Sequence, residues 1–270
     1  MTGFKYHITT GLFMLKINLQ SQLEYPAFLI GWLLNNALQF GAGIGMMWVI
    51  TNQFQDINGW SFGHIAFMYG LGVISHGLAV VIFIQTWFID GLVVHGEFDR
   101  MLLRPMNVYF QFCVYTINLI GITDIIPGGI VLTLGIISTG FNLNLQNIFG
   151  LIIVIIGATM IRGGVYTLVG SIGFWTKNTR NIVMVIQDLI TRTHMYPLSI
   201  FNRTTQAILT FILPLGFMTF YPAAYFLDME TGFRFPGYMP FWVFLIGLIC
   251  MILGRAVFTA GLRHYDSAGN

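Results

Sequence analysis

The sequence has 270 residues, of which 56% are hydrophobic and only 8% are charged. Soluble domains carry about 25% charged residues, so a soluble fold is excluded and the chain is predicted to be an all-α integral membrane protein. The net charge of +2 is too small to indicate nucleic-acid binding, and Cys113 and Cys250 lie in apolar runs typical of buried free thiols.

The first segment, residues 4–25, mixes apolar residues with charged and amide side chains. Phe13 and Ile17 are four positions apart, so they share one face of a helix. This pattern predicts an amphipathic helix that lies in the membrane interface. Pro26 then starts the first apolar run, at a helix position where its missing N–H costs little.

Six apolar runs have the ~20 residues needed to cross a bilayer as a helix. A single transmembrane domain over residues 1–270 is therefore expected, with no soluble domain. The predicted spans are Ala27–Ile50, Phe62–Ile89, Phe112–Thr139, Ile148–Phe174, Ala207–Phe226 and Phe241–Ala260.

Lysine and arginine predict the orientation of these spans. Nine of these cations fall on one side of the six-span layout and one, Arg234, on the other. Cytoplasmic loops carry the excess of positive charge, so both termini are predicted to be cytoplasmic. The nine cations are Lys5, Lys16, Arg100, Arg104, Lys177, Arg180, Arg192, Arg203 and Arg263.

The densest charge cluster, "HGEFDRMLLRP" at 95–105, lies between the second and third spans. A helix over 91–104 places Phe98, Met101 and Leu102 on one face and Glu97 and Arg100 on another. An apolar face of this kind suits docking onto another protein. The alternative is a solvated loop whose arginines only set the topology.

Asp124 in the third span and Arg162 in the fourth are expected at comparable depth. Either charge alone costs about 3 kcal/mol at a bilayer centre, so we expect them to pair or to face a wet interior. The pair is interpreted as a structural ion pair, and the alternatives are a substrate contact or a latch between two halves of the protein.

The second cytoplasmic segment, 176–203, is predicted to continue as a helix along the inner surface, with Ile182, Ile186 and Ile190 in its apolar stripe and a break at Tyr196–Pro197. In the first span, Gly41 and Gly45 form one Gly-x-x-x-Gly match, which marks that span as a candidate dimer surface.

No catalytic or metal site is predicted. His64 and His76 fall on different faces of the second span, so they do not form a metal-ligand pair. An intramembrane enzyme would need a nucleophile clustered with a base, and the sequence contains no such cluster. None of the lysines follows a glycine as a phosphate-binding loop requires, so any ATP and Mg²⁺ must be bound by a partner.

Three stretches carry a resemblance to a known family: "GEFDRMLLRPMNVYFQF" at 96–112, "YPLSIFNRTTQAILTFILP" at 196–214 and "FYPAAYFL" at 220–227. The chain resembles the permease subunit of bacterial type-2 ATP-binding-cassette (ABC) exporters, in particular the branch encoded as two different permeases beside one ATPase. The resemblance implies that the helix after the second span is the coupling helix, which docks into the ATPase. The residues that take this role are Glu97, Phe98, Asp99, Arg100, Leu103, Arg104 and Pro105.

The resemblance also implies short re-entrant helices on the outer side, at about residues 222–240. Tyr221, Pro222, Tyr225 and Phe226 are then candidates for an outer gate, and the alternative is an ordinary interfacial aromatic belt. The implied partners are two copies of an ABC ATPase and a second permease, or a second copy of this chain, in the bacterial inner membrane.

An ATP-independent channel or secondary transporter is the alternative function. It predicts several intramembrane carboxylates and repeated discontinuous helices, whereas Asp124 is the one clear intramembrane carboxylate here.

Overall fold

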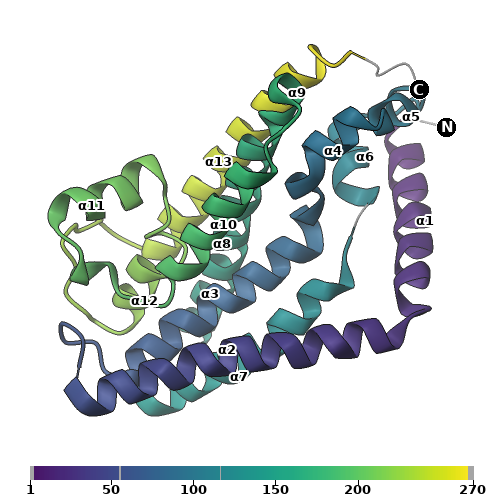
Figure 1. The fold of residues 1–270 in the computed structure, drawn as a ribbon. Helices are drawn as coiled ribbons and strands as arrows, with labels where there is room; N and C mark the ends of the chain where they lie inside the picture. The colour runs from purple at the N-terminus through teal and green to yellow at the C-terminus, as the bar shows by residue number, and fades with distance from the viewer. Residues whose placement is uncertain (1–2, 55, 116, 267–270) are drawn as a thin grey trace.

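The computed structural model describes residues 3–54, 56–115 and 117–266, and these residues form helices joined by short connections (Figure 1). No β-strand occurs within the described ranges, which agrees with the predicted all-α class. In chain order the elements are α1 (Gly3–Leu23), α2 (Pro26–Phe54), α3 (Phe62–Phe83), η1 (Ile84–Phe88), α4 (Ile89–Val94), α5 (Glu97–Leu102), α6 (Val108–Tyr115), η2 (Leu119–Gly121), α7 (Ile122–Thr139), α8 (Leu145–Ser171), α9 (Gly173–Thr176), α10 (Arg180–Thr193), η3 (Leu198–Ile200), α11 (Arg203–Ala207), η4 (Ile208–Ile212, a π-helix), α12 (Phe220–Phe226) and α13 (Met239–Leu262).

Five helical segments of the described chain are long and apolar enough to cross a membrane: Pro26–Gln53, Phe62–Val94, Leu119–Thr139, Leu145–Thr176 and Met239–Leu262. They correspond to the predicted spans one, two, three, four and six. The predicted fifth span, 207–226, is not one helix, because it is divided into α11, the π-helix η4, a turn and α12.

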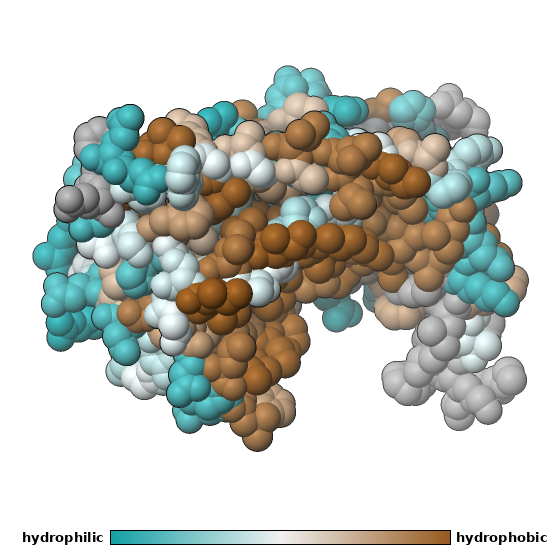
Figure 2. Space-filling view, turned by 90° about the horizontal axis from the view of Figure 1, so that it is seen from below, coloured by the Kyte–Doolittle hydropathy of each residue, from teal (hydrophilic) through white to brown (hydrophobic). Residues whose placement is uncertain are grey.

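The surface has the pattern expected of a membrane protein. Apolar residues cover the middle of the molecule and hydrophilic residues gather toward its two ends (Figure 2). Helices α5, α6 and α9 lie with the end of α13 at one end, whereas α12 lies with the end of α2 at the other (Figure 1).

Glycines let the central helices touch backbone to backbone. A Cβ on Gly135 of α7 would lie 2.4 Å from Phe67 N of α3, and one on Gly164 of α8 would lie 2.4 Å from Cys250 C of α13. Small residues at such contacts let helices approach closely in lipid. Eleven of the crowded glycines are spaced seven residues apart within their segments: Gly63, Gly70 and Gly77 in α3, Gly121, Gly128 and Gly135 along η2 and α7, Gly157 and Gly164 in α8, and Gly247, Gly254 and Gly261 in α13.

Helix α2 is the least covered of the five long segments, since only 11% of its apolar window is buried within the chain. Leu34 and Leu38 are 61% and 75% exposed. A Cβ on Gly41 or Gly45 would meet nothing within 4 Å, so the Gly-x-x-x-Gly match makes no contact within this chain. Its use as a dimer surface stays a prediction.

Helix α10 does not lie on the inner surface as predicted. Its first turn is held beside α4, because Asp90 accepts the backbone N–H groups of Thr179 and Arg180. His194, directly after α10, contacts Arg162 inside α8. Helix α10 therefore runs antiparallel to α8 toward the centre of the molecule, and the break at Tyr196–Pro197 follows it. In the predicted stripe Ile190 is buried, whereas Ile182 is 48% exposed.

The predicted third span, 112–139, is also interrupted. It is divided into α6, a non-helical stretch, η2 and α7. The polar backbone at this break is partly satisfied by Gln22 of α1, which donates to Ile117 O at 2.5 Å and accepts from Leu119 N at 2.7 Å. Irregular backbone survives at membrane depth only when its polar groups find partners inside the protein.

Candidate functional site: a surface helix and a buried polar core

Helix α5 carries the charged stretch between the second and third long segments. Gly96 directly before it has φ of 68°, a left-handed conformation that suits glycine. The expected single helix over 91–104 is therefore divided into α4 and α5. Glu97 and Asp99 lie in the first turn of α5, where negative charge is stabilised by the helix dipole.

Phe98 anchors α5 to the rest of the chain. Its side chain is fully buried and packs against rings of Phe112, Phe174 and Phe258, with ring centroids 5.0–6.1 Å apart. Met101 is also buried. Of the expected docking face, Phe98 and Met101 are covered by the chain itself, whereas Leu102 is 50% exposed.

A different set of residues, in α5 and directly after it, faces outward. Leu103 is 86% exposed, and Arg104 and Pro105 are exposed beside it. Arg100 is exposed and pairs with Glu97, three positions earlier. An exposed pair of this kind contributes little stability. We call the outward-facing residues Arg100, Leu102, Leu103, Arg104 and Pro105 the α5 tip.

Asp99 joins α5 to the chain after α13. Its Oδ1 accepts a hydrogen bond from the hydroxyl of Tyr265 at 3.0 Å. Burial, together with the hydrogen bond and the charge of Asp99, raises the pKa of Tyr265 to about 12. The hydroxyl therefore stays a donor throughout the physiological pH range.

Asp124 lies in the first turn of α7, directly after the break in the third span. Asn36 of α2 donates to Asp124 Oδ1 and, at 2.8 Å, to Thr123 Oγ1. His76 of α3 places Nε2 at 3.9 Å from Asp124 Oδ2. Residues of three helices thus meet at this carboxylate, which is 4% exposed.

Arg162 lies on α8 and is fully buried. Its guanidinium donates to Ser75 Oγ at 3.2 Å, to Gly72 O at 3.2 Å and to His194 Nδ1 at 3.0 Å. Arginine has no acceptor, so His194 Nδ1 must accept in this contact and its ring carries the proton on Nε2. Arg162 thus ties α8 to α3 and to the end of α10.

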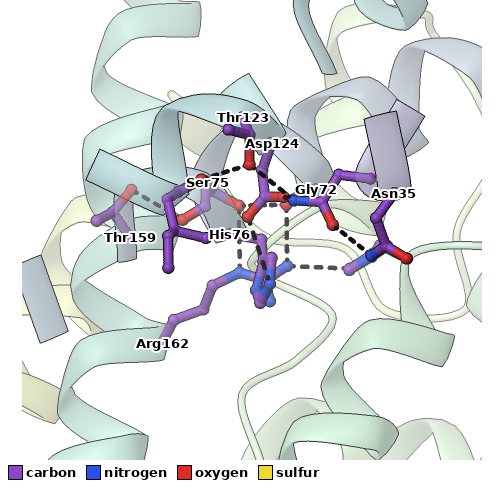
Figure 3. A network of polar contacts seen from close by, with 11 residues as sticks. Asn35, Gly72, Ser75, His76, Thr123, Asp124, Thr159 and Arg162 are labelled. Carbon is purple, nitrogen blue, oxygen red and sulfur yellow. Dashed lines mark hydrogen bonds and ion pairs between the residues drawn. The ribbon is translucent and has the colours of Figure 1, made fainter. Parts of the chain in front are cut away.

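The predicted ion pair between Asp124 and Arg162 is wrong. In Figure 3, dashed lines join the guanidinium of Arg162 to Ser75 and Gly72, and none joins it to Asp124. No carboxylate within the described ranges lies within 4.0 Å of Arg162. Both residues contact neighbouring positions of α3, but each has its own set of partners, because α3 passes between α7 and α8.

A cavity of about 610 Å³ opens beside Asp124. It lies between α2, α3, α7 and α10. Asp124 and His76 supply polar groups to its wall, and Arg162 is not part of its lining. Its aromatic lining comes from Trp32, Phe40, Trp87 and Phe88.

The proposed outer-gate residues fall into two environments. Tyr221 and Pro222 are buried in α12, and the Tyr221 hydroxyl lies 2.7 Å from Thr210 Oγ1 of η4. Tyr225 and Phe226 line a polar recess of about 560 Å³ at the end opposite α5, together with Asp228, Glu230 and Arg234. Residues 227–238 contain no helix. The expected re-entrant segment, 222–240, therefore holds most of α12, which starts at Phe220, and the first two residues of α13.

Sequence reasoning missed Asn36, Ser75 and His194. Asn36 carried a signal, since "NN" at 35–36 interrupts an otherwise apolar run. His194 lay outside every predicted span, and its role depends on the course of α10. Ser75 had no signal, because a serine in an apolar helix usually bonds its own backbone.

The comparison with protein families gives one match. The model of the ABC-2 family of transporter proteins matches residues 38–269. The chain belongs to the ABC-2 transporter family. No curated protein matches it. It is therefore a permease-type, multi-pass membrane protein.

Proposed function

We propose that this chain is the transmembrane subunit of an ATP-driven exporter in the bacterial inner membrane, with α5 as the coupling helix for a separate ATPase. The observation that carries the proposal is the α5 tip. Leu103 is 86% exposed, whereas Phe98 in the same short segment is fully buried. A surface element fixed in this way suits the transmission of a partner's movement into the helices.

Energy must come from outside this chain. The lysines Lys5, Lys16 and Lys177 follow Phe4, Leu15 and Thr176, so no glycine-lysine phosphate loop is present in the sequence. Membership of the ABC-2 family favours an ABC ATPase as the partner. Two copies of that ATPase bind the ATP and Mg²⁺ and close against two permeases.

The exposed apolar face of α2 supports a second permease beside this one. Lipid also covers such a face, so the exposure alone does not select the partner. We propose a different permease, and a second copy of this chain is the alternative outcome. The translocation path then runs between the two permeases.

The test is purification of the tagged chain from its native host in mild detergent, followed by identification of the proteins that accompany it. Leu103→Asp places a charge in the α5 tip and is expected to abolish recovery of the ATPase. Leu145→Asp is the matched control, since Leu145 is 72% exposed at the opposite end of the molecule. It should leave recovery unchanged.

A second permease in the wild-type preparation supports the heteromer. If no ATPase accompanies the wild-type chain, or if Leu103→Asp retains it fully, the coupling role of α5 is refuted. Absence of any ATPase favours the ATP-independent channel or secondary transporter.

A further inference from the structure

The cavity beside Asp124 has the size and wall of a ligand site. Its volume of about 610 Å³ lies within the ~300–1,000 Å³ range of small-molecule sites. Aromatic rings from α2 and from the α3–η1 segment form much of the wall, including Trp32, Trp87 and Phe88. A small number of polar groups converge among these rings.

The charge of the wall indicates the sign of the ligand. Asp124 Oδ1 accepts from Asn36, but no hydrogen-bond donor of the described chain reaches Asp124 Oδ2. His76 is the nearest titratable group to Oδ2, at 3.9 Å, and its Nδ1 has no hydrogen-bond partner in the described ranges. The deep part of the cavity therefore presents a carboxylate without a cation bonded to it.

The two arginines near the cavity do not neutralise Asp124. The guanidinium of Arg162 is turned toward Gly72, Ser75 and His194 and is absent from the lining. Arg180, at the start of α10, is itself part of the lining, but it forms no ion pair with Asp124 within 4.0 Å, and its guanidinium lies over the ring of Phe88, 5.5 Å from the centroid. Asp188, the acidic residue of α10, pairs with Arg192 and does not line the cavity.

We propose that this cavity binds an organic cation with an apolar body, with Asp124 as its counter-charge and the aromatic rings around its apolar part. Aromatic faces attract cations, and a carboxylate in a poorly hydrated cavity gains most from an opposite charge. The proposal deepens the proposed function, because it names the chemical class of the transported substrate. Such a cation comes either from a free lipophilic amine or from an amine-bearing lipid headgroup.

The test compares two probes of the same shape and opposite charge, tetraphenylphosphonium and tetraphenylborate. Their binding to the purified full-length complex is measured in detergent without ATP, with empty micelles subtracted. Asp124→Asn keeps the side-chain shape and an acceptor for Asn36. It is expected to weaken cation binding by about tenfold or more and to leave anion binding undiminished.

Two further variants keep the test decisive if Asp124→Asn folds poorly. Gln187 of α10 lines the cavity and is only half-buried, so Gln187→Lys is expected to fold. It adds a positive charge to the wall and should weaken binding of the cation relative to the anion. Asp188→Asn is the control, since it removes an acid of α10 outside the cavity, and it should bind both probes as the wild type does.

Competition then identifies the natural source of the cation. Displacement of tetraphenylphosphonium by short-chain phosphatidylethanolamine, but not by short-chain phosphatidylglycerol, supports a lipid headgroup. Displacement by neither supports a free amine. Unchanged cation binding in both Asp124→Asn and Gln187→Lys, or an equal loss of both probes, overturns the proposal. Because no ATP is involved, that result leaves the ATPase co-purification test unaffected.

Discussion

The hydroxyl of Tyr265 donates a hydrogen bond to Asp99 at 3.0 Å, which joins the chain after the last helix to the short helix α5. Together with Phe98, this contact fixes α5 from two sides. The segment proposed to meet the ATPase is therefore held by residues far away in the sequence.

Tyr265 is expected to titrate near pH 12 instead of near 10, because burial and Asp99 favour the neutral phenol. A raised pKa means that the stabilising contribution is complete below pH 10 and is lost as the pH rises through 12. The measurement is the ultraviolet difference spectrum of wild type against Tyr265→Phe during alkaline titration. A phenol that titrates at 10 contradicts the observed hydrogen bond.

Phe98→Ala is expected to destabilise the chain by about 3–5 kcal/mol, because it removes a fully buried ring and leaves a cavity. Thermal unfolding in detergent, followed by loss of the monodisperse peak, measures the effect. The control Leu103→Ala truncates an 86% exposed side chain and should leave the unfolding temperature unchanged. Equal effects of the two substitutions contradict the anchoring role.

Gly121→Ala tests the close approach of α3 to the start of α7. The added Cβ would lie 2.2 Å from the carbonyl oxygen of Gly77, so the two backbones must separate, at a cost of about 1–3 kcal/mol. Gly129→Ala on α7 meets nothing within 4 Å and serves as the matched control. Protease resistance of the purified chain should fall for Gly121→Ala alone.

Arg162→Ala is expected to reduce the yield of folded protein. It leaves His194 Nδ1 without its donor, which costs about 1–3 kcal/mol for a buried group, and it removes one of the two side-chain donors to the Gly72 carbonyl, which keeps the Ser75 hydroxyl. Arg162→Lys keeps the charge and one or two donors, so a smaller loss is expected. Fluorescence-detected size-exclusion chromatography ranks the three proteins. An Arg162→Ala protein as stable as wild type contradicts a structural role.

Hydropathy predicted most of the fold, because membrane helices need long apolar runs. The predicted fourth span, 148–174, matches α8 and α9 to within three residues at its start. A helix in the segment 176–203 was predicted and is present as α10, but hydropathy did not predict its course, because its charged and amide residues resemble those of a surface segment. Asp188 and Arg192 pair as their spacing suggests, yet only the course of the chain reveals that α10 packs along α8.

The sequence predicted the contacts of the candidate site less well than it predicted the spans. Asp124 and Arg162 were found because charge is rare in apolar runs, but their partners were predicted wrongly. Depth along two spans does not determine which face of each helix a side chain occupies. The interruption before α7 also changes the rotation of Asp124 relative to an ideal continuous helix.

Phe98 contacts rings carried by α6, α9 and α13 within one cluster. A close-packed cluster resists compression, so a displacement of α5 reaches all three segments together. If α5 is the coupling helix as proposed, the helices that it contacts move at the same time when the ATPase partner moves it. Probes placed on α6 and on α13 should report the same rate constant, with no intermediate in which one segment has moved and the other has not.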